Sequence, residues 1–171
     1  MLDQVIGFLN PNSTECVIMS VKEEKPAANP TLSFEDRFDY YRMFNPAKWY
    51  TNSSVPALSD ARGKIVLLRR FGAAHLPKGI DATSWPDNAA PGFTANNLAV
   101  EDWYKVTDNP TKWTYISSGL SGAFGDNNAN VLHLTFASVV SQNCAYICWP
   151  KRQRTAALQD ASRFPAHRWA R

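Results

Sequence analysis

The segment Asp60–Phe71, with the sequence DARGKIVLLRRF, constrains the fold of this chain more than any other stretch. Within it, Ile65–Leu68 is apolar at every position, which is typical of a parallel strand buried on both faces. Arg69 and Arg70 follow at once. Because two guanidinium groups are costly to bury, they indicate that the strand ends where the sheet meets solvent. Ligands of α/β proteins bind at this carboxyl edge, so we expect a site there.

Three elements are predicted before this strand. Apolar residues recur at i, i+3, i+4 and i+7 over 2–9, which is the stripe of an amphipathic helix. The short apolar run Cys16–Val21 predicts a second buried strand, and it too is followed by charged residues. Ser33 with Asp36 three residues later has the pattern of a helix N-cap, so we expect a helix to begin there.

After the central strand, the segment Leu98–Val106 alternates between apolar and polar residues and predicts another strand. Asp102 and Tyr104 would then interrupt its apolar face, because side chains two apart on a strand point the same way. We predict a helix over Thr111–Phe124, begun by a proline, and a strand over Val131–Phe136.

The segments 49–59 and 72–84 are predicted to be irregular. They are rich in Pro, Ser, Asn and Gly and contain no periodic apolar pattern. The remaining elements alternate between strand and helix without an internal repeat. This order favours an α/β sheet over an all-β or all-α domain.

Length and composition exclude several classes of protein. A chain of 171 residues, 44% of them hydrophobic, supports one core and therefore one domain. It is shorter than the ~250 residues that are typical of a complete (β/α)8 barrel. No apolar run approaches the ~20 residues of a membrane span. The opening residues Met1–Asp3 lack the basic region of a signal peptide.

The helix and strand patterns end near Gln142, where we place a boundary. Residues 1–141 form the predicted domain, and residues 142–171 form a tail with six basic side chains and one acidic one. The net charge of the whole chain is only +3, and short basic ends are usually solvated. We therefore expect no nucleic-acid partner and interpret the tail as poorly ordered or as the product of a shifted reading frame.

The cysteines predict neither a disulfide framework nor a metal site. Their number, three, is odd, and Cys16 lies in an apolar run where a small buried hydrophobic side chain is expected. Cys144 and Cys148 have no second Cys or His pair at the spacing of a zinc site. We expect no metal and no cofactor.

Four segments of the chain resemble the bacterial-type phosphatidylinositol-specific phospholipases C, of the phospholipase C-like phosphodiesterase superfamily. The DARGKIVLLRR segment is specific on its own, and a weaker fifth segment, HLTFAS, resembles the strand that follows in the family. The resemblance covers roughly residues 1–140 and corresponds to the central to C-terminal part of the family domain. The four segments, in order, are NSTECVIMSVKEE (Asn12–Glu24), DARGKIVLLRR (Asp60–Arg70), WPDN (Trp85–Asn88) and VEDWYKV (Val100–Val106).

The resemblance implies a distorted, incompletely closed β/α barrel of the TIM type, with its site at the carboxyl ends of the strands. We expect a partial barrel in this chain, because the N-terminal strands and the last strand of the family have no counterpart in the sequence. Such a sheet has open edges and uncovered apolar surface, which predict self-association or low solubility.

The resemblance also implies that seven side chains hold an inositol headgroup. Acidic groups would accept hydrogen bonds from ring hydroxyls, while Lys22 and Arg70 would donate, and the Tyr104 ring would offer a flat face to the cyclitol. Without the resemblance, structural ion pairing is at least as good an explanation for Lys22, Glu24, Arg70, Asp102 and Tyr104. By strand alternation Arg69 faces away from the site, as an outward salt-bridge partner. The seven are Lys22, Glu24, Arg70, Trp85, Asp87, Asp102 and Tyr104.

Family enzymes cleave phosphatidylinositol to diacylglycerol and a cyclic inositol phosphate. One histidine acts as general base, a second acts as general acid, and an arginine offsets charge on the phosphoryl oxygens. The resemblance places these three groups upstream of any residue in this sequence, so we assign no catalytic residue. We expect surface or packing roles for His75, His133 and His167.

The leading hypothesis is a phosphatidylinositol-specific phosphodiesterase that meets its lipid at a membrane surface, represented by a truncated and inactive chain. No protein partner is implied. Family members are commonly exported, so the parent protein is expected to be secreted. Two alternatives remain: a non-catalytic module that binds inositol or a sugar, and a gene fragment without a function.

Overall fold

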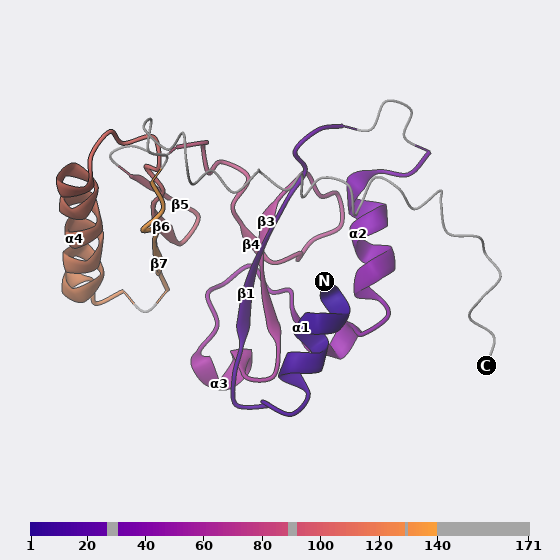
Figure 1. The fold of residues 1–171 in the computed structure, drawn as a ribbon. Helices are drawn as coiled ribbons and strands as arrows, with labels where there is room; N and C mark the ends of the chain where they lie inside the picture. Colours follow the sequence, from indigo (N-terminus) through magenta and orange to yellow (C-terminus); the bar gives the residue numbers. More distant parts are fainter. Residues whose placement is uncertain (27–30, 89–91, 129, 140–171) are drawn as a thin grey trace.

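The computed structural model describes residues 1–26, 31–88, 92–128 and 130–139. These residues form two β-sheets with helices on their outer sides (Figure 1), which is the mixed α/β architecture predicted from the sequence. The elements, in chain order, are α1 (Leu2–Leu9), β1 (Val17–Lys22), α2 (Phe34–Arg42), the short 3-10 helix η1 (Pro46–Lys48), β2 (Trp49–Tyr50), α3 (Leu58–Ala61), β3 (Ile65–Arg70), β4 (Ile80–Asp81), β5 (Phe93–Ala95), β6 (Leu98–Glu101), α4 (Asn109–Gly125) and β7 (Leu132–Thr135).

The first sheet is parallel and is centred on β3. Strand β1 pairs with β3 along its full length, from Val17 beside Ile65 to Lys22 beside Arg70. On the other side of β3, β2 pairs with its beginning and β4 with its end. The prediction of a buried parallel strand at this position is confirmed.

The second sheet has the order β5-β6-β7. Strands β5 and β6 are antiparallel, and the turn between them places Asn96 and Asn97 at φ angles of 52° and 65°. Asparagine tolerates this left-handed conformation, which two-residue hairpin turns require. Strands β6 and β7 are parallel, so they need a crossover, and α4 provides it.

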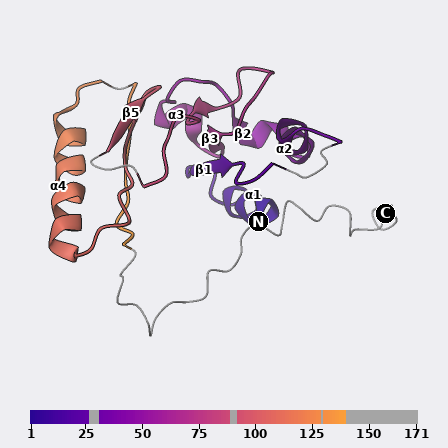
Figure 2. The ribbon, with the colours of Figure 1, turned by 90° about the horizontal axis from the view of Figure 1, so that it is seen from above.

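The side chains of β3 divide between two cores, because successive residues on a strand face opposite sides. Ile65 and Leu67 pack against α1 and α2 in one cluster. Val66 and Leu68 pack toward the second sheet in the other cluster. Figure 2 shows the resulting order of layers from above: α4, the second sheet, the first sheet, and then α1 and α2. Figure 1 shows the same order from the side.

Most of the predicted elements are present. The helix predicted over 2–9 is α1, and the strand predicted over Cys16–Val21 is β1, displaced by one residue. Ser33 begins α2 with a full capping box, in which its hydroxyl accepts from the Asp36 N–H and the Asp36 carboxylate accepts from the Ser33 N–H. The helix predicted over Thr111–Phe124 is α4, and the strand predicted over Val131–Phe136 is β7.

The strand predicted over Leu98–Val106 is wrong in its second half, since β6 ends at Glu101 and the alternating residues after it are not in a strand. Five further elements were missed, among them the three-residue 3-10 helix η1. Strands β2, β4 and β5 are two or three residues long, and α3 has one turn. Elements this short contain too few residues to produce a periodic pattern, and pairing with β3 or β6 defines the three strands instead.

Several predictions concern residues that the structure does not describe. The boundary near Gln142, the tail over 142–171, and the roles of Cys144, Cys148 and His167 all lie outside the described ranges. In the ranges that are described, no helix combines the length and apolar character that crossing a bilayer requires.

A buried carboxylate on α2 fastens the loop between β3 and β4. Glu35 is 6% exposed and accepts hydrogen bonds from the Lys78 ammonium and from the backbone N–H groups of Ala74 (2.7 Å) and His75 (3.1 Å). Lys78 also pairs with Asp39 on α2. Burial alone would favour the protonated acid, but these donors outweigh it and hold the pKa of Glu35 at about 2, against an ordinary 4.5.

This shift predicts a loss of stability in acid. Because the pKa of Glu35 is lower in the folded chain, its contribution is complete above pH 4.5 and is lost as the pH falls toward about 2. The free energy of unfolding, measured by urea denaturation, should fall less steeply over this window in Glu35→Gln than in the unmutated chain. The exposed control Glu15→Gln should keep the original slope, and an unchanged slope in Glu35→Gln would contradict the assignment.

Gly79, directly before β4, occupies a position where we expect no side chain to fit. Its φ is +72°, and an added Cβ would lie 2.6 Å from the Leu67 carbonyl oxygen. We expect Gly79→Ala to lower the free energy of unfolding by more than about 2 kcal/mol. The control Gly7→Ala, in the exposed middle of α1 with nothing within 4 Å, should raise it by about 0.5–1 kcal/mol. Urea denaturation of both variants tests the pair.

Candidate functional site

The predicted site begins at the carboxyl ends of β1 and β3. Lys22 and Arg70 are the last residues of these strands and lie directly opposite each other in the register. Registered residues of parallel strands share a face, and this face is the one on which Val66 and Leu68 pack toward the second sheet. The two cations therefore lie together on the side of the first sheet that faces the second one.

Arg70, Trp85 and Asp102 form a chain of contacts across the site. The Arg70 guanidinium lies 4.3 Å from the centre of the Trp85 ring and donates to the Trp85 carbonyl oxygen at 3.2 Å. The Trp85 Nε1–H donates in turn to Asp102 Oδ2 at 3.2 Å. Since Trp85 is buried in the core between the sheets, it is a rigid support for both charged groups.

A second group of contacts is centred on Asp87. The Tyr104 hydroxyl donates to both carboxylate oxygens of Asp87, at 2.8 and 3.0 Å, and Lys105 Nζ lies 3.1 Å from one of them. The Asn88 amide oxygen accepts from the Lys105 backbone N–H at 2.7 Å. Asn88 has a φ of 55°, which asparagine tolerates better than most residues. The WPDN segment is therefore joined to the segment after β6 at several points.

Lys22 and Glu24 complete the site at its exposed edge, where their side chains pair at 3.2 Å. Glu24 and Asp87 both act electrostatically on Arg70, and Lys22 acts on Asp87. The structure therefore brings all seven residues predicted from the sequence into one neighbourhood. Three carboxylates, three cations if Lys105 is counted, and two aromatic rings meet there, which is a donor and acceptor set suited to a neutral polyol.

Comparisons with known proteins find bacterial enzymes that are similar in sequence and in fold. The 1-phosphatidylinositol phosphodiesterase of Staphylococcus aureus (strain Newman) is 31% identical over 158 residues, covering 85% of this chain and 50% of that protein. The enzyme of the same name from Listeria monocytogenes is 27% identical over 169 residues, covering 94% of this chain and 48% of that protein. A solved structure of the S. aureus phosphatidylinositol-specific phospholipase C matches with a TM-score of 0.69 and 30% identity, covering 85% of this chain and 52% of that one.

The chain is a relative of the bacterial phosphatidylinositol-specific phospholipases C. The resemblance predicted from the sequence is confirmed. The chain spans about half the length of the curated relatives it matches, and no family model matches it. A solved structure of the Listeria phospholipase C, at 24% identity and a TM-score of 0.62, agrees in fold.

Burial and pairing shift the pKa values of the groups in this phospholipase C-like site. Burial lowers the pKa of Arg70, against the opposing effects of Asp102, Glu24 and Asp87. Burial also raises the pKa of Asp102, although the Trp85 indole and Arg70 act in the other direction. At Asp87 the Tyr104 hydroxyl and then Lys105 lower the pKa. Of Asp87 and Asp102, Asp102 is therefore the acid whose pKa lies above its ordinary value.

The coupling between Arg70 and Asp102 is directly measurable. Arg70→Met removes a positive charge that favours the Asp102 carboxylate, so the pKa of Asp102 should rise further above its ordinary value. A pH titration of the side-chain carboxyl carbon by NMR measures it. Lys22→Met is the matched control, because Lys22 is not among the charges that shift Asp102, and it should leave this pKa unchanged. A fall in the pKa after Arg70→Met would contradict the geometry.

Arg69 departs in part from its prediction. It does face away from Arg70 and it does form a salt bridge, at 2.9 Å, with Asp81 of β4. It does not face outward, however, because it is only 5% exposed and its guanidinium also donates to the Phe71 carbonyl oxygen at 2.6 Å. The reason is that β4, which the sequence pattern did not predict, pairs beside this strand end and brings Asp81 opposite Arg69.

Sequence reasoning also missed four residues around the site. Asn88 and Lys105 lie inside the matching motifs, but their contacts depend on how the two motifs meet in space. Glu101, the residue before Asp102, is buried against Lys112 of α4. The observable signal was a charged residue at the end of a strand, the same signal that singled out Arg70.

The described histidines lie away from the site. His75 is exposed and approaches Glu35 at 3.5 Å, and His133 of β7 pairs with Asp126 at 2.9 Å. In the described ranges, no group of three or more His, Cys, Asp or Glu side chains is arranged to hold a metal ion.

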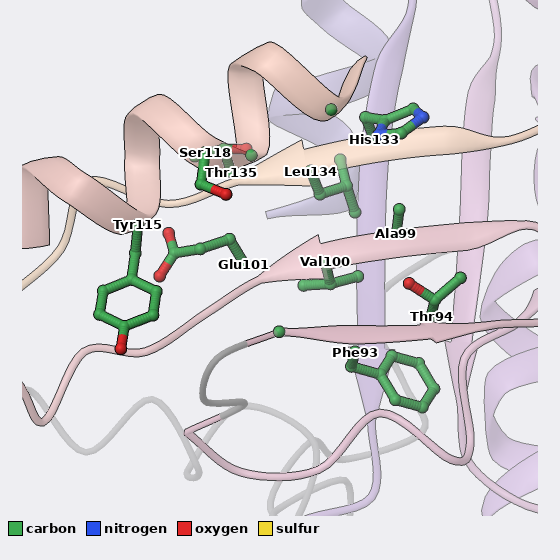
Figure 3. A pocket seen from close by; sticks show the side chains of 13 residues that line it. Phe93, Thr94, Ala99, Val100, Glu101, Tyr115, Ser118, His133, Leu134 and Thr135 are labelled. Carbon is green, nitrogen blue, oxygen red and sulfur yellow. The ribbon is translucent and has the colours of Figure 1, made fainter. Parts of the chain in front are cut away.

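A separate cavity of about 270 Å³ lies between α4 and the second sheet (Figure 3). Ser118 and Gly119 of α4 line it, together with Glu101 and Thr135 of the sheet. None of the seven predicted site residues contributes to its wall.

Proposed function

We propose that this chain is the headgroup-recognising part of a phosphatidylinositol-specific phosphodiesterase of the phospholipase C type. The observation that carries the proposal is that the seven residues of the family motifs meet at one place, on the inner side of β3. Motif residues as far apart in the sequence as Lys22 and Tyr104 would have no reason to converge if each were only a surface ion pair. The similarity to two phosphatidylinositol phosphodiesterases supports the same substrate class.

In this proposal each charged side chain takes one part of the inositol ring. Arg70 and Lys22 donate to ring hydroxyls, and Glu24, Asp87 and Asp102 accept from them. Arg70 is suited to a fixed contact because Trp85 supports its guanidinium plane. The half-buried Tyr104 ring offers an apolar face to the C–H side of the cyclitol.

Cleavage to diacylglycerol and cyclic inositol phosphate requires two histidines acting on opposite sides of the phosphorus. Neither His75 nor His133, the histidines in the described part of the chain, contacts the seven residues. We therefore propose that this chain binds the headgroup and does not cleave the lipid by itself.

The two sheets fit this proposal as parts of one partial TIM-type barrel. The apolar core between them is continuous from β3 to β6 and β7. Ile18 of edge strand β1 lies on the same inner face and is 46% exposed. Its exposure is expected where a barrel is not closed. The lipid would be met at a membrane surface, in an extracellular setting.

Binding of myo-inositol to the purified chain, measured by calorimetry, tests the recognition site. Arg70→Ala should weaken it by at least about tenfold, since a hydrogen bond to a charged group contributes about 1.5–3 kcal/mol. Arg62→Ala is the matched control, because Arg62 is exposed at the end of α3 and away from the site. It should bind like the unmutated chain.

Vesicles of phosphatidylinositol provide the second arm of this test. The chain should bind them and release no water-soluble cyclic inositol phosphate at high protein concentration. Turnover would overturn the proposal that this chain lacks cleavage activity. Absence of both inositol and vesicle binding would overturn the recognition function.

A further inference from the structure

A buried ion pair lies directly behind the candidate site. Glu101, the last residue of β6, is 5% exposed, and Lys112 of α4 is 2% exposed. Lys112 Nζ donates to both Glu101 carboxylate oxygens, at 2.8 and 3.0 Å. Lys112 is the one buried residue of α4, so a charged side chain makes the most buried contact of this helix with the sheet.

The pair also holds the backbone on the far side of Asp102. The Trp103 N–H donates to Glu101 Oε1 at 3.0 Å, and the Trp103 carbonyl oxygen accepts from Lys112 Nζ at 3.0 Å. The Glu101 carboxylate thus holds the peptide N–H of Trp103, and the Lys112 ammonium holds both that carboxylate and the Trp103 carbonyl oxygen. Asp102 is the residue between Glu101 and Trp103.

These contacts explain why the strand ends where it does. The Trp103 N–H donates to the Glu101 carboxylate and is therefore not available to a strand partner. Asp102 lies on the side opposite Glu101, where it accepts from the Trp85 indole at 3.2 Å, while Glu101 faces α4. Figure 3 shows the Glu101 side chain extending from β6 toward α4.

The close approach of α4 to the sheet supports the same contact. A Cβ at Gly119 would lie 2.8 Å from Thr135 Oγ1 and 3.6 Å from Glu101 Cβ, so the helix lies against β6 and β7 only because this position is glycine. On the same helix, the Tyr115 ring packs edge-on against Trp103 at 4.5 Å. Both contacts hold the residues that flank Asp102.

We propose that Glu101 and Lys112 are positioning residues, which fix Asp102 in the orientation that binds a ring hydroxyl. The inference rests on the proposed function for its ligand and on the contacts above for its geometry. An apolar pair of similar volume often stabilises a fold as well as a buried ion pair does, so stability alone gives no reason for the charges. The orientation of Asp102 is a reason for these two charges.

The test uses the double variant Glu101→Leu/Lys112→Met in the full chain. It removes both charges together and avoids leaving one unpaired, which is the usual cause of unfolding at such a site. The readout that needs no ligand is the NMR resonance of the Trp85 indole N–H, assigned with Trp85→Phe. The variant Asp102→Ala gives the position of the indole resonance when the hydrogen bond to Asp102 is lost.

The matched control is Glu35→Leu/Lys78→Met. It removes the other buried Glu–Lys pair, of similar exposure, on the opposite face of the first sheet. The control should leave the indole resonance in place even if it lowers the melting temperature. The milder double variant Glu101→Gln/Lys112→Gln, which keeps polar groups but no charge, should move the resonance part of the way and serves if the first double variant does not fold.

The expected result is a folded variant whose indole resonance moves toward that of Asp102→Ala and whose dissociation constant for myo-inositol rises at least about tenfold. Either double variant, if it folds and its indole resonance does not move, would overturn the positioning role. Failure of the unmutated chain to bind inositol would overturn the proposed function instead, and the indole resonance would still report on the geometry.

Discussion

The alternation of side chains along β3 is the constraint on which the rest of the structure depends. Four consecutive apolar residues are buried only if both faces of the strand are covered, and the two faces have different covers. One faces the helices and the other faces the second sheet. The two arginines that follow continue the alternation, so Arg69 and Arg70 point to opposite faces of the sheet. Arg69 is drawn into the structural pair with Asp81, and Arg70 enters the space between the sheets.

The sequence predicts long elements and motif residues well, for a physical reason. The stripe of α1, the capping box of α2 and the apolar run of β3 are local patterns of at least four residues. Each of these patterns either forms hydrogen bonds within its own segment or marks an apolar face that must be buried, whichever element it packs against. The family motifs could be placed because the resemblance gave the roles of residues such as Arg70 and Asp102 directly.

The missed features depend on contacts between distant segments. The two-residue strands β2 and β4 exist only as partners of β3. The predicted strand beyond Glu101 fails because that carboxylate binds Lys112 and its own i+2 peptide. A period-two pattern continues through this point in the sequence, but the strand ends at the buried Glu101. Tertiary pairing overrides the local pattern in both cases.

The contacts within the site of the free chain have a consequence for selectivity. Asp87 already holds the Tyr104 hydroxyl, and Asp102 already holds the Trp85 indole. A polyol that enters must exchange these hydrogen bonds for its own, so the number of bonds changes little and the side chains have little freedom left to lose. A ring that lacks one matching hydroxyl leaves a partly buried group unpaired. The site would then discriminate among stereoisomers by penalising the wrong ring more than by rewarding the right one.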